Sequence, residues 1–468
     1  MTQTISDPTP TQSSTPTPPH TAEHRPRLPL IFTALMLAML LSSLGQTVFS
    51  AALPTIVGEL GGVDHMTWVI TAYLLGETIS LPLFGKLGDQ IGRKGLFLGT
   101  LTGFVVGSLL GGLATSMTVL IVARAIQGTS AGGMMILSQA ITADVVSARE
   151  RGKYMGIIGA VFGVSSVLGP VLGGWFTDGP GWRWGLWLNV PIGIVTIIVA
   201  ALVLRVPARE KKLTMDWLGI LTMIVATTSL ILTVTWGGNE YDWTSPQIIG
   251  LGITAVVFAA VFVLVELRAE DPLIPMTFFA NRNFLLTTSV GLAVGIFMFG
   301  SMSYLPTYLQ MVHAMSPTTA GLMMTPMMLG VMGTSTIVGG IVSRTGKYKR
   351  YPIIGMIATA AALALLSTLE PDTSLVVIGL YLFLLGFGVG NAMQILVLIV
   401  QNSFPIAVVG TATAANNFFR QIGGAIGSAL VGGIFVANLR DQLATRMPAA
   451  IQELGAGAAN YKDMLASG

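Results

Sequence analysis

Long apolar runs are the feature that most constrains what this chain can fold into. Thirteen stretches are long enough to cross about 30 Å of hydrocarbon, which takes roughly 20 helical residues. Only 10% of the 468 residues are charged and 52% are hydrophobic, a balance that does not suit a water-exposed surface. The sequence therefore predicts an all-α integral membrane protein, with spans near 29–57, 66–86, 95–115, 117–142, 154–178, 184–206, 217–236, 247–267, 284–312, 319–343, 351–369, 374–402 and 410–438.

The lysines and arginines predict the orientation of these spans, because cytoplasmic loops collect them. Eighteen of the 24 fall in segments on one side of the spans, including Arg25 and Arg27 before the first span. Arg183 is the one base in a loop on the other side. We therefore expect a multi-pass protein of the cytoplasmic membrane with its amino terminus in the cytoplasm.

Several function classes are disfavoured by composition. The bases sit between spans, so nucleic-acid binding is not expected despite the net charge of +3. The chain has no cysteine, and its four histidines (20, 24, 65 and 313) are scattered, so no metal site is expected. We expect no cofactor, and no set of nucleophile, base and orienting acid indicates an enzyme.

A charged ten-residue turn separates the second and third spans. It runs from Gly85 to Lys94 and follows the pattern G-x-L-x-D-x-x-G-R-K. Its glycines, which include Gly85 and Gly92, allow two helices to approach closely, and Asp89 and Arg93 can pair. An ordinary positive loop would explain the bases but not the glycine and aspartate spacing. The pattern closely resembles the signature loop of the major facilitator superfamily of transporters, which implies a conformational hinge at Gly85, Asp89, Gly92, Arg93 and Lys94.

The turn also recurs later in the chain, which indicates two homologous halves. Gly85 and Gly92 recur as Gly339 and Gly346 at an offset of 254 residues, while Asp89 becomes Ser343. Transporters built from such repeats bind substrate between the halves near the middle of the membrane.

Two extra spans lie between the halves and are best interpreted as an inserted hairpin. This arrangement is similar to that of the fourteen-span drug:proton antiporter family, and implies a major facilitator fold with two pseudo-symmetric bundles. The final span of that family is not predicted here, because Arg440 to Gly468 contains no long apolar run, so we expect either a truncated chain or a carboxyl terminus outside the cell. The expected organisation is a disordered cytoplasmic tail (1–28), a six-helix bundle (29–206), the hairpin (207–270), a second bundle with five spans (271–438), and a polar tail expected on the outer side (439–468).

Glu77 is the one acidic residue deep inside a predicted span. A carboxyl group there is costly to ionise, which suits a reversible proton carrier. The alternative is a neutral, hydrogen-bonded glutamic acid that only packs. Relatives read Leu-Asp-x-Thr in the first span where this chain reads Leu44-Gly45-Gln46-Thr47, so the usual acid is missing and the resemblance shifts proton coupling to Glu77.

Arg124 in the fourth span resembles the arginine that the family associates with proton coupling. It lies about 10 Å from the outer end of its helix, at 1.5 Å per residue, so we expect a bond to Glu77, Gln127, Gln46 or backbone carbonyls. The alternative is that its side chain extends to the outer headgroups.

The fifth span carries small residues three or four apart, a face that lets another backbone approach. Gly169, Pro170, Gly173 and Gly174 within it match the family's antiporter motif, which implies export. Close packing alone would also explain the glycines.

Polar, aromatic and methionine side chains inside the spans are the candidate ligand contacts, since methionine-rich and aromatic surfaces adapt to varied apolar ligands. The candidates are Gln46, Phe49, Tyr73, Gln127, Met302, Tyr304, Asn391, Gln394, Asn417 and Arg420.

Together with the resemblance, these residues predict a monomeric, proton-coupled antiporter that exports amphiphilic or cationic drugs and dyes by alternating access. Its partners are then a small amphiphilic substrate, protons and membrane lipid. Export of a specific lipid, peptide or metabolite, or a truncated and non-transporting relative, are the alternatives.

Overall fold

The computed structural model describes residues 28–62, 65–205, 214–238 and 240–453. The predicted tail before residue 28 and the part of the predicted polar tail after Glu453 lie outside these residues. The described part is helical apart from turns and one isolated bridge between Gly237 and Tyr241. The predicted all-α fold is confirmed.

The first half begins with a broken helix. α1 (Leu28–Thr47) and α2 (Phe49–Leu60) replace the single span predicted at 29–57, with an interruption at Val48. The half continues with α3 (Met66–Ile91), α4 (Arg93–Gly112), α5 (Met117–Val145), α6 (Arg151–Asp178), α7 (Trp184–Trp187) and α8 (Asn189–Val203).

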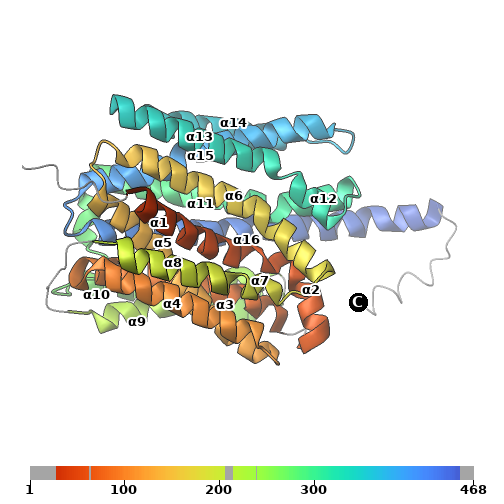
Figure 1. Cartoon of the computed structure of the whole chain (residues 1–468). Helices are drawn as coiled ribbons and strands as arrows, with labels where there is room; N and C mark the ends of the chain where they lie inside the picture. Colours follow the sequence, from red (N-terminus) through yellow and green to blue (C-terminus); the bar gives the residue numbers. More distant parts are fainter. Residues whose placement is uncertain (1–27, 63–64, 206–213, 239, 454–468) are drawn as a thin grey trace, which may run out of the picture.

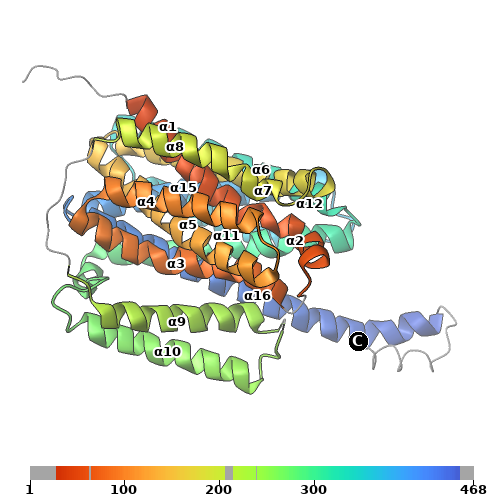
Figure 2. The same cartoon turned by 60° about the horizontal axis from the view of Figure 1, so that its bottom comes forward.

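The inserted hairpin comprises α9 (Trp217–Trp236) and α10 (Pro246–Glu266), which lie side by side along one flank of the bundle (Figure 2). Asp216 and Ser245 cap their amino ends by accepting bonds from Gly219 and Ile248 backbone N–H groups. The predicted hairpin is thus present as a separate layer.

The second half follows a short connecting turn, η2 (Met276–Ala280). Its helices are α11 (Arg282–Val312), α12 (Pro317–Leu322), α13 (Thr325–Thr345), α14 (Arg350–Leu366), α15 (Leu375–Ser403) and α16 (Val409–Glu453).

Within the described residues, twelve helices have the length and apolar composition of a membrane span, against thirteen predicted. The thirteenth, α14, has 17 residues, which is the lower end of the usual range. The last helix also differs from expectation, because α16 continues past residue 438 to Glu453 and extends beyond the bundle (Figure 1).

The two halves pack through exchanged helix pairs. α6 of the first half packs on α13 of the second, and α16 of the second packs on α3 of the first. The 254-residue offset relates α3 to α13 and α6 to α16, so the two contacts are equivalent by pseudo-symmetry. Glycines permit the first contact: a Cβ on Gly156 would lie 2.4 Å from the Ser335 carbonyl oxygen.

Helix α3 also packs closely on α5, and Gly128 controls the separation. A Cβ at Gly128 would lie 2.1 Å from the Tyr73 carbonyl oxygen, so Gly128→Ala must push the helices apart. We expect a loss of about 1–3 kcal/mol of stability, seen as a lower thermal midpoint in detergent. The control is Gly99→Ala in α4, because no atom of a neighbouring element lies within 4 Å of a Cβ placed on Gly99. Equal midpoints for the two variants would contradict this packing.

Candidate functional site

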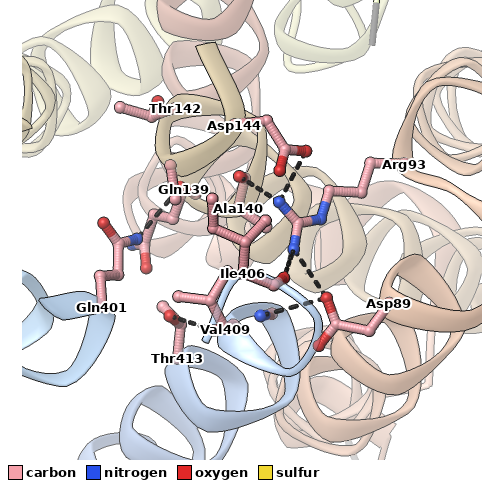
Figure 3. Close-up of polar contacts among 12 residues, drawn as sticks. Asp89, Arg93, Gln139, Ala140, Thr142, Asp144, Gln401, Ile406, Val409 and Thr413 are labelled. Carbon is pink, nitrogen blue, oxygen red and sulfur yellow. Dashed lines mark hydrogen bonds and ion pairs between the residues drawn. The ribbon is translucent and has the colours of Figure 1, made fainter. Parts of the chain in front are cut away.

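The ion cluster at the predicted hinge lies where α3, α4, α5 and α16 meet. Arg93 is nearly fully buried, and its guanidinium lies 2.7 Å from Asp89 and 2.7 Å from Asp144 (Figure 3). It also donates to the Ala140 carbonyl at 2.6 Å. The pairing of Asp89 and Arg93 expected from the sequence is therefore present, with Asp144 added.

Asp89 also reaches across to the second half. Its carboxylate accepts from the backbone N–H groups of Gly410 at 3.2 Å and Thr411 at 2.7 Å, and from the Thr411 hydroxyl at 2.9 Å. These groups open α16, whose amino terminus carries the positive end of the helix dipole. One carboxylate thus joins a helix end in one half to an arginine in the other.

The local backbone aims Arg93 into this cluster. Gly92 has a φ of 94°, a left-handed conformation that side chains rarely adopt, and it ends α3 so that Arg93 can begin α4. The equivalent Gly346 of the second half has a φ of 70°. Both copies of the turn therefore use a glycine for the same geometric reason. Lys94 points away from the cluster and donates to the Ala201 carbonyl at 2.8 Å.

Further polar contacts join the halves at the same end of the bundle, called here the hinge end. Arg151 donates to the Gln401 carbonyl and the Asn402 side chain at 3.3 and 3.2 Å. Gln139 accepts from the Asn417 side chain at 2.8 Å through its side-chain oxygen and from Gln401 at 3.1 Å through its backbone carbonyl. The halves are therefore closed against each other at the hinge end.

The inserted hairpin is also fastened to the hinge turn. Lys86 pairs with Asp271 and donates to the Pro272 carbonyl at 2.8 Å, while Gln90 donates to Asp271 and to the Thr214 carbonyl at 2.8 and 2.9 Å. Thr214 precedes α9 and Asp271 follows α10. Both linkers of the hairpin therefore meet the last turns of α3.

Glu77 is buried in α3, deeper in the bundle. Its Oε2 atom has no hydrogen-bond partner among the described residues. Arg420 of α16 and Arg124 of α5, both buried, interact with it electrostatically. The carboxyl is thus influenced by a cation from each half.

Arg124 is completely buried, so the alternative in which its side chain extends to the headgroups is wrong. It donates to the Gly45 carbonyl at 2.7 Å, the Gln127 side chain at 3.1 Å and the Val69 carbonyl at 3.2 Å. The rings of Phe49 and Tyr73 lie 4.4 and 4.2 Å from its guanidinium carbon. No hydrogen bond from Arg124 to Glu77 or Gln46 is among these contacts.

A cavity of about 190 Å³ has Arg124 among its lining residues. We call it the seam cavity, because α1, α3 and α5 of the first half, α11 and α16 of the second half, and α9 of the hairpin all contribute to its wall. Its polar lining residues are Gln46, Tyr73, Arg124, Thr235, Ser303, Gln421 and Ser428.

The predicted antiporter-motif glycines pack α6 against the break between α1 and α2. A Cβ on Gly169 would lie 1.9 Å from the Thr47 hydroxyl, and one on Gly173 would lie 2.3 Å from the Val48 carbonyl. Gly174 has open space, and the side chain of Pro170 lies outside the described residues. Two of the motif glycines thus set a close helix contact.

The candidate ligand residues are brought together only in part. Gln46 and Tyr73 line the seam cavity. Phe49 and Gln127 do not line it but contact Arg124, which does. Five others do not line the cavity. Met302 packs on the core of the second half, and the ring centroid of Tyr304 lies 5.8 Å from that of Phe435. Asn391 donates to the Phe387 carbonyl, Gln394 is buried beside Gly159, and Asn417 donates to the Gln139 side chain.

Sequence reasoning missed Asp144 and Asp271. It allowed Asp89 to accept from the amino terminus of a neighbouring helix, but it did not identify that helix as α16. Asp144 and Asp271 are acids at the ends of hydrophobic segments, among the bases of the hinge side. That placement was the available signal. Their partners lie far away in the sequence, so the individual pairs could not be read from it.

The protein is a polytopic membrane chain of two closely packed helical bundles. Hydrogen bonds join the bundles at one end, where a buried carboxylate caps a helix of the other half. The sequence profile of the Major Facilitator Superfamily matches residues 35–428. The chain belongs to this superfamily.

Two relatives of similar sequence support this family assignment. An uncharacterized MFS-type transporter of Mycobacterium tuberculosis is 44% identical over 418 residues, 89% of this chain and 61% of the relative. The multidrug transporter protein MdtP of Bacillus subtilis is 37% identical over 436 residues, 93% of this chain and 80% of the relative. The chain thus spans about three fifths of the length of the mycobacterial protein.

Solved structures show the same fold. The human organic anion transporter MFSD10 (TETRAN) matches with a TM-score of 0.64 at 17% identity, covering 88% of this chain and 94% of that one. The proton:xylose symporter XylE matches with a TM-score of 0.58 at 14% identity, covering 89% of this chain and 90% of that one. The predicted major facilitator fold is confirmed.

Asp89→Asn tests the hinge cluster. The amide weakens the bonds to Arg93 and to the amino end of α16, and the buried positive charge of Arg93 is then less fully neutralised. The state closed at the hinge end should therefore lose population. We expect a turnover reduced at least about tenfold, a factor worth only about 1.4 kcal/mol, with little change in ligand affinity.

The matched control for this variant is Glu150→Gln, which removes a carboxylate from an exposed loop at the same end. Turnover and binding measured in proteoliposomes separate the two effects. Wild-type turnover in Asp89→Asn would leave the cluster without a switching role.

Proposed function

We propose that this transporter is a proton-coupled antiporter that exports amphiphilic compounds from the cytoplasm. The observation that carries the proposal is the buried Glu77 carboxyl, with one oxygen lacking a hydrogen bond in the described chain and a cation from each half acting on it. A group in that position can take up a proton without breaking an existing ion pair.

Alternating access then follows from the contacts at the hinge end. The predominance of bases in the loops there supports a cytoplasmic location for that end and for the amino terminus, in the cytoplasmic membrane. The Asp89 cluster would hold the halves together in the outward-facing state and release them when the cytoplasmic side opens.

Relatives support the class of substrate. Two Bacillus subtilis proteins at 37% and 35% identity are named as a multidrug transporter and a multidrug resistance protein. We accordingly propose varied amphiphilic drugs or dyes as substrates. The α9–α10 hairpin supports membership of the fourteen-span branch, and a monomer contains both halves of the proposed site.

Glu77→Gln tests the coupling. The amide resembles the protonated carboxyl, so the variant should fold and bind dye but lose the acceleration of efflux by a proton gradient. Dye efflux from vesicles is measured with and without a protonophore, and dye binding is measured in detergent.

Glu59→Gln is the control for this experiment, because Glu59 is a carboxylate at the other end of the bundle, bonded to Trp182 and Arg183. Gradient-driven efflux that persists in Glu77→Gln would remove Glu77 from coupling. Wild-type protein that exports no dye under any gradient would contradict the proposed function itself.

A further inference from the structure

The charges around the seam cavity are strongly unequal. Arg124 is the one charged side chain among the described residues that line it, and no acidic side chain is among them. Arg420 lies buried in α16, one residue before the cavity-lining Gln421. Two guanidiniums and the single Glu77 carboxyl therefore leave an excess of positive charge in this region, even when Glu77 is ionised.

The remaining lining supplies hydrogen bonds and apolar surface. Gln46, Ser303, Gln421 and Ser428 carry amides and hydroxyls, which bind neutral polar groups, and Phe299 and Leu74 provide apolar contact. A cationic ligand would find no carboxylate here and would be repelled by Arg124. An anionic ligand would offset the buried positive charge, which a low-dielectric site favours.

The inserted hairpin closes one side of this cavity. Val234 and Thr235, near the end of α9, line it together with residues of both halves. The hairpin is held on α3 beside them, because Thr67 donates to Glu240 at 2.5 Å and the Trp68 and Trp236 rings pack edge to face at 5.5 Å. The hairpin is therefore part of the cavity wall rather than a detached appendage.

We propose that the seam cavity binds neutral or anionic amphiphiles and discriminates against cations, with α9 of the inserted hairpin as one of its walls. This inference rests on the proposed export function and narrows its substrate class. It also gives the hairpin a direct role in ligand selection through Val234 and Thr235.

The absence of cysteine from the chain allows a direct test. Thr235→Cys in the full chain introduces one thiol at the cavity wall, and its labelling by a maleimide reports whether the cavity is occupied. The probes are fluorescein, which is anionic, and rhodamine 123, a cation built on the same xanthene ring system. At roughly ten times its Kd, fluorescein should slow labelling about tenfold, because only about a tenth of the molecules are then free. Rhodamine 123 at equal concentration should protect far less.

The matched control is Ile249→Cys on α10, whose side chain is exposed on the outside of the hairpin near the same end. Neither dye should change its labelling. Gln421→Glu adds a carboxylate to the cavity and should weaken fluorescein protection at least about tenfold while strengthening that by rhodamine 123. Gln421→Met, which has similar size and no charge, should not reverse the preference.

Equal protection of Thr235→Cys by the two dyes would overturn the charge preference. Failure of both dyes to protect it, in a protein that exports them, would overturn the assignment of the cavity and leave the export function standing. A wild-type protein that exports neither dye would contradict the proposed export function. That result is distinct from the two above, which concern the binding preference of the seam cavity and the place of α9 in its wall.

Discussion

The contact of the Asp89 carboxylate with the amino end of α16 is the interaction on which the arrangement of the halves depends. Asp89 and Arg93 are nearly excluded from solvent, so each needs its partners to offset the cost of burying a charge. Arg93 faces two carboxylates, and the positive end of α16 offsets part of the excess negative charge. The cluster is complete only when the halves meet at the hinge end, so its geometry depends on the conformation of the whole protein.

The same turn connects the hairpin to the halves. Lys86 and Gln90 lie on the last turns of α3, one helical turn or less from Asp89, and hold both hairpin linkers. A movement of α3 at the hinge would therefore act on α9 and α10 as well as on α16. At the opposite end, α9 meets α3 again through Trp236 and Trp68. The hairpin is thus attached to α3 at both of its ends.

The candidate site could be predicted from the sequence only in part. Glu77 and Arg124 were recognisable because a charge inside an apolar span is costly and therefore conspicuous. Tyr73 and Gln46 were recognisable as polar side chains at suitable depth. Asn391, Gln394 and Asn417 share that signal, yet they lie away from the seam cavity. Depth along a helix can be counted, whereas the direction in which a side chain points depends on which helices pack against it.

The sequence by itself determined the helical membrane class, the two-fold repeat and the inserted hairpin, because apolar length, charge placement and glycine spacing are local properties. The break at Val48, the shortness of α14 and the continuation of α16 to Glu453 were decided by the folded chain. Only the tertiary structure placed Arg420 of one half near Glu77 of the other, and Thr235 of the hairpin beside both halves. These residues are far apart in sequence, and helix packing alone brings them together.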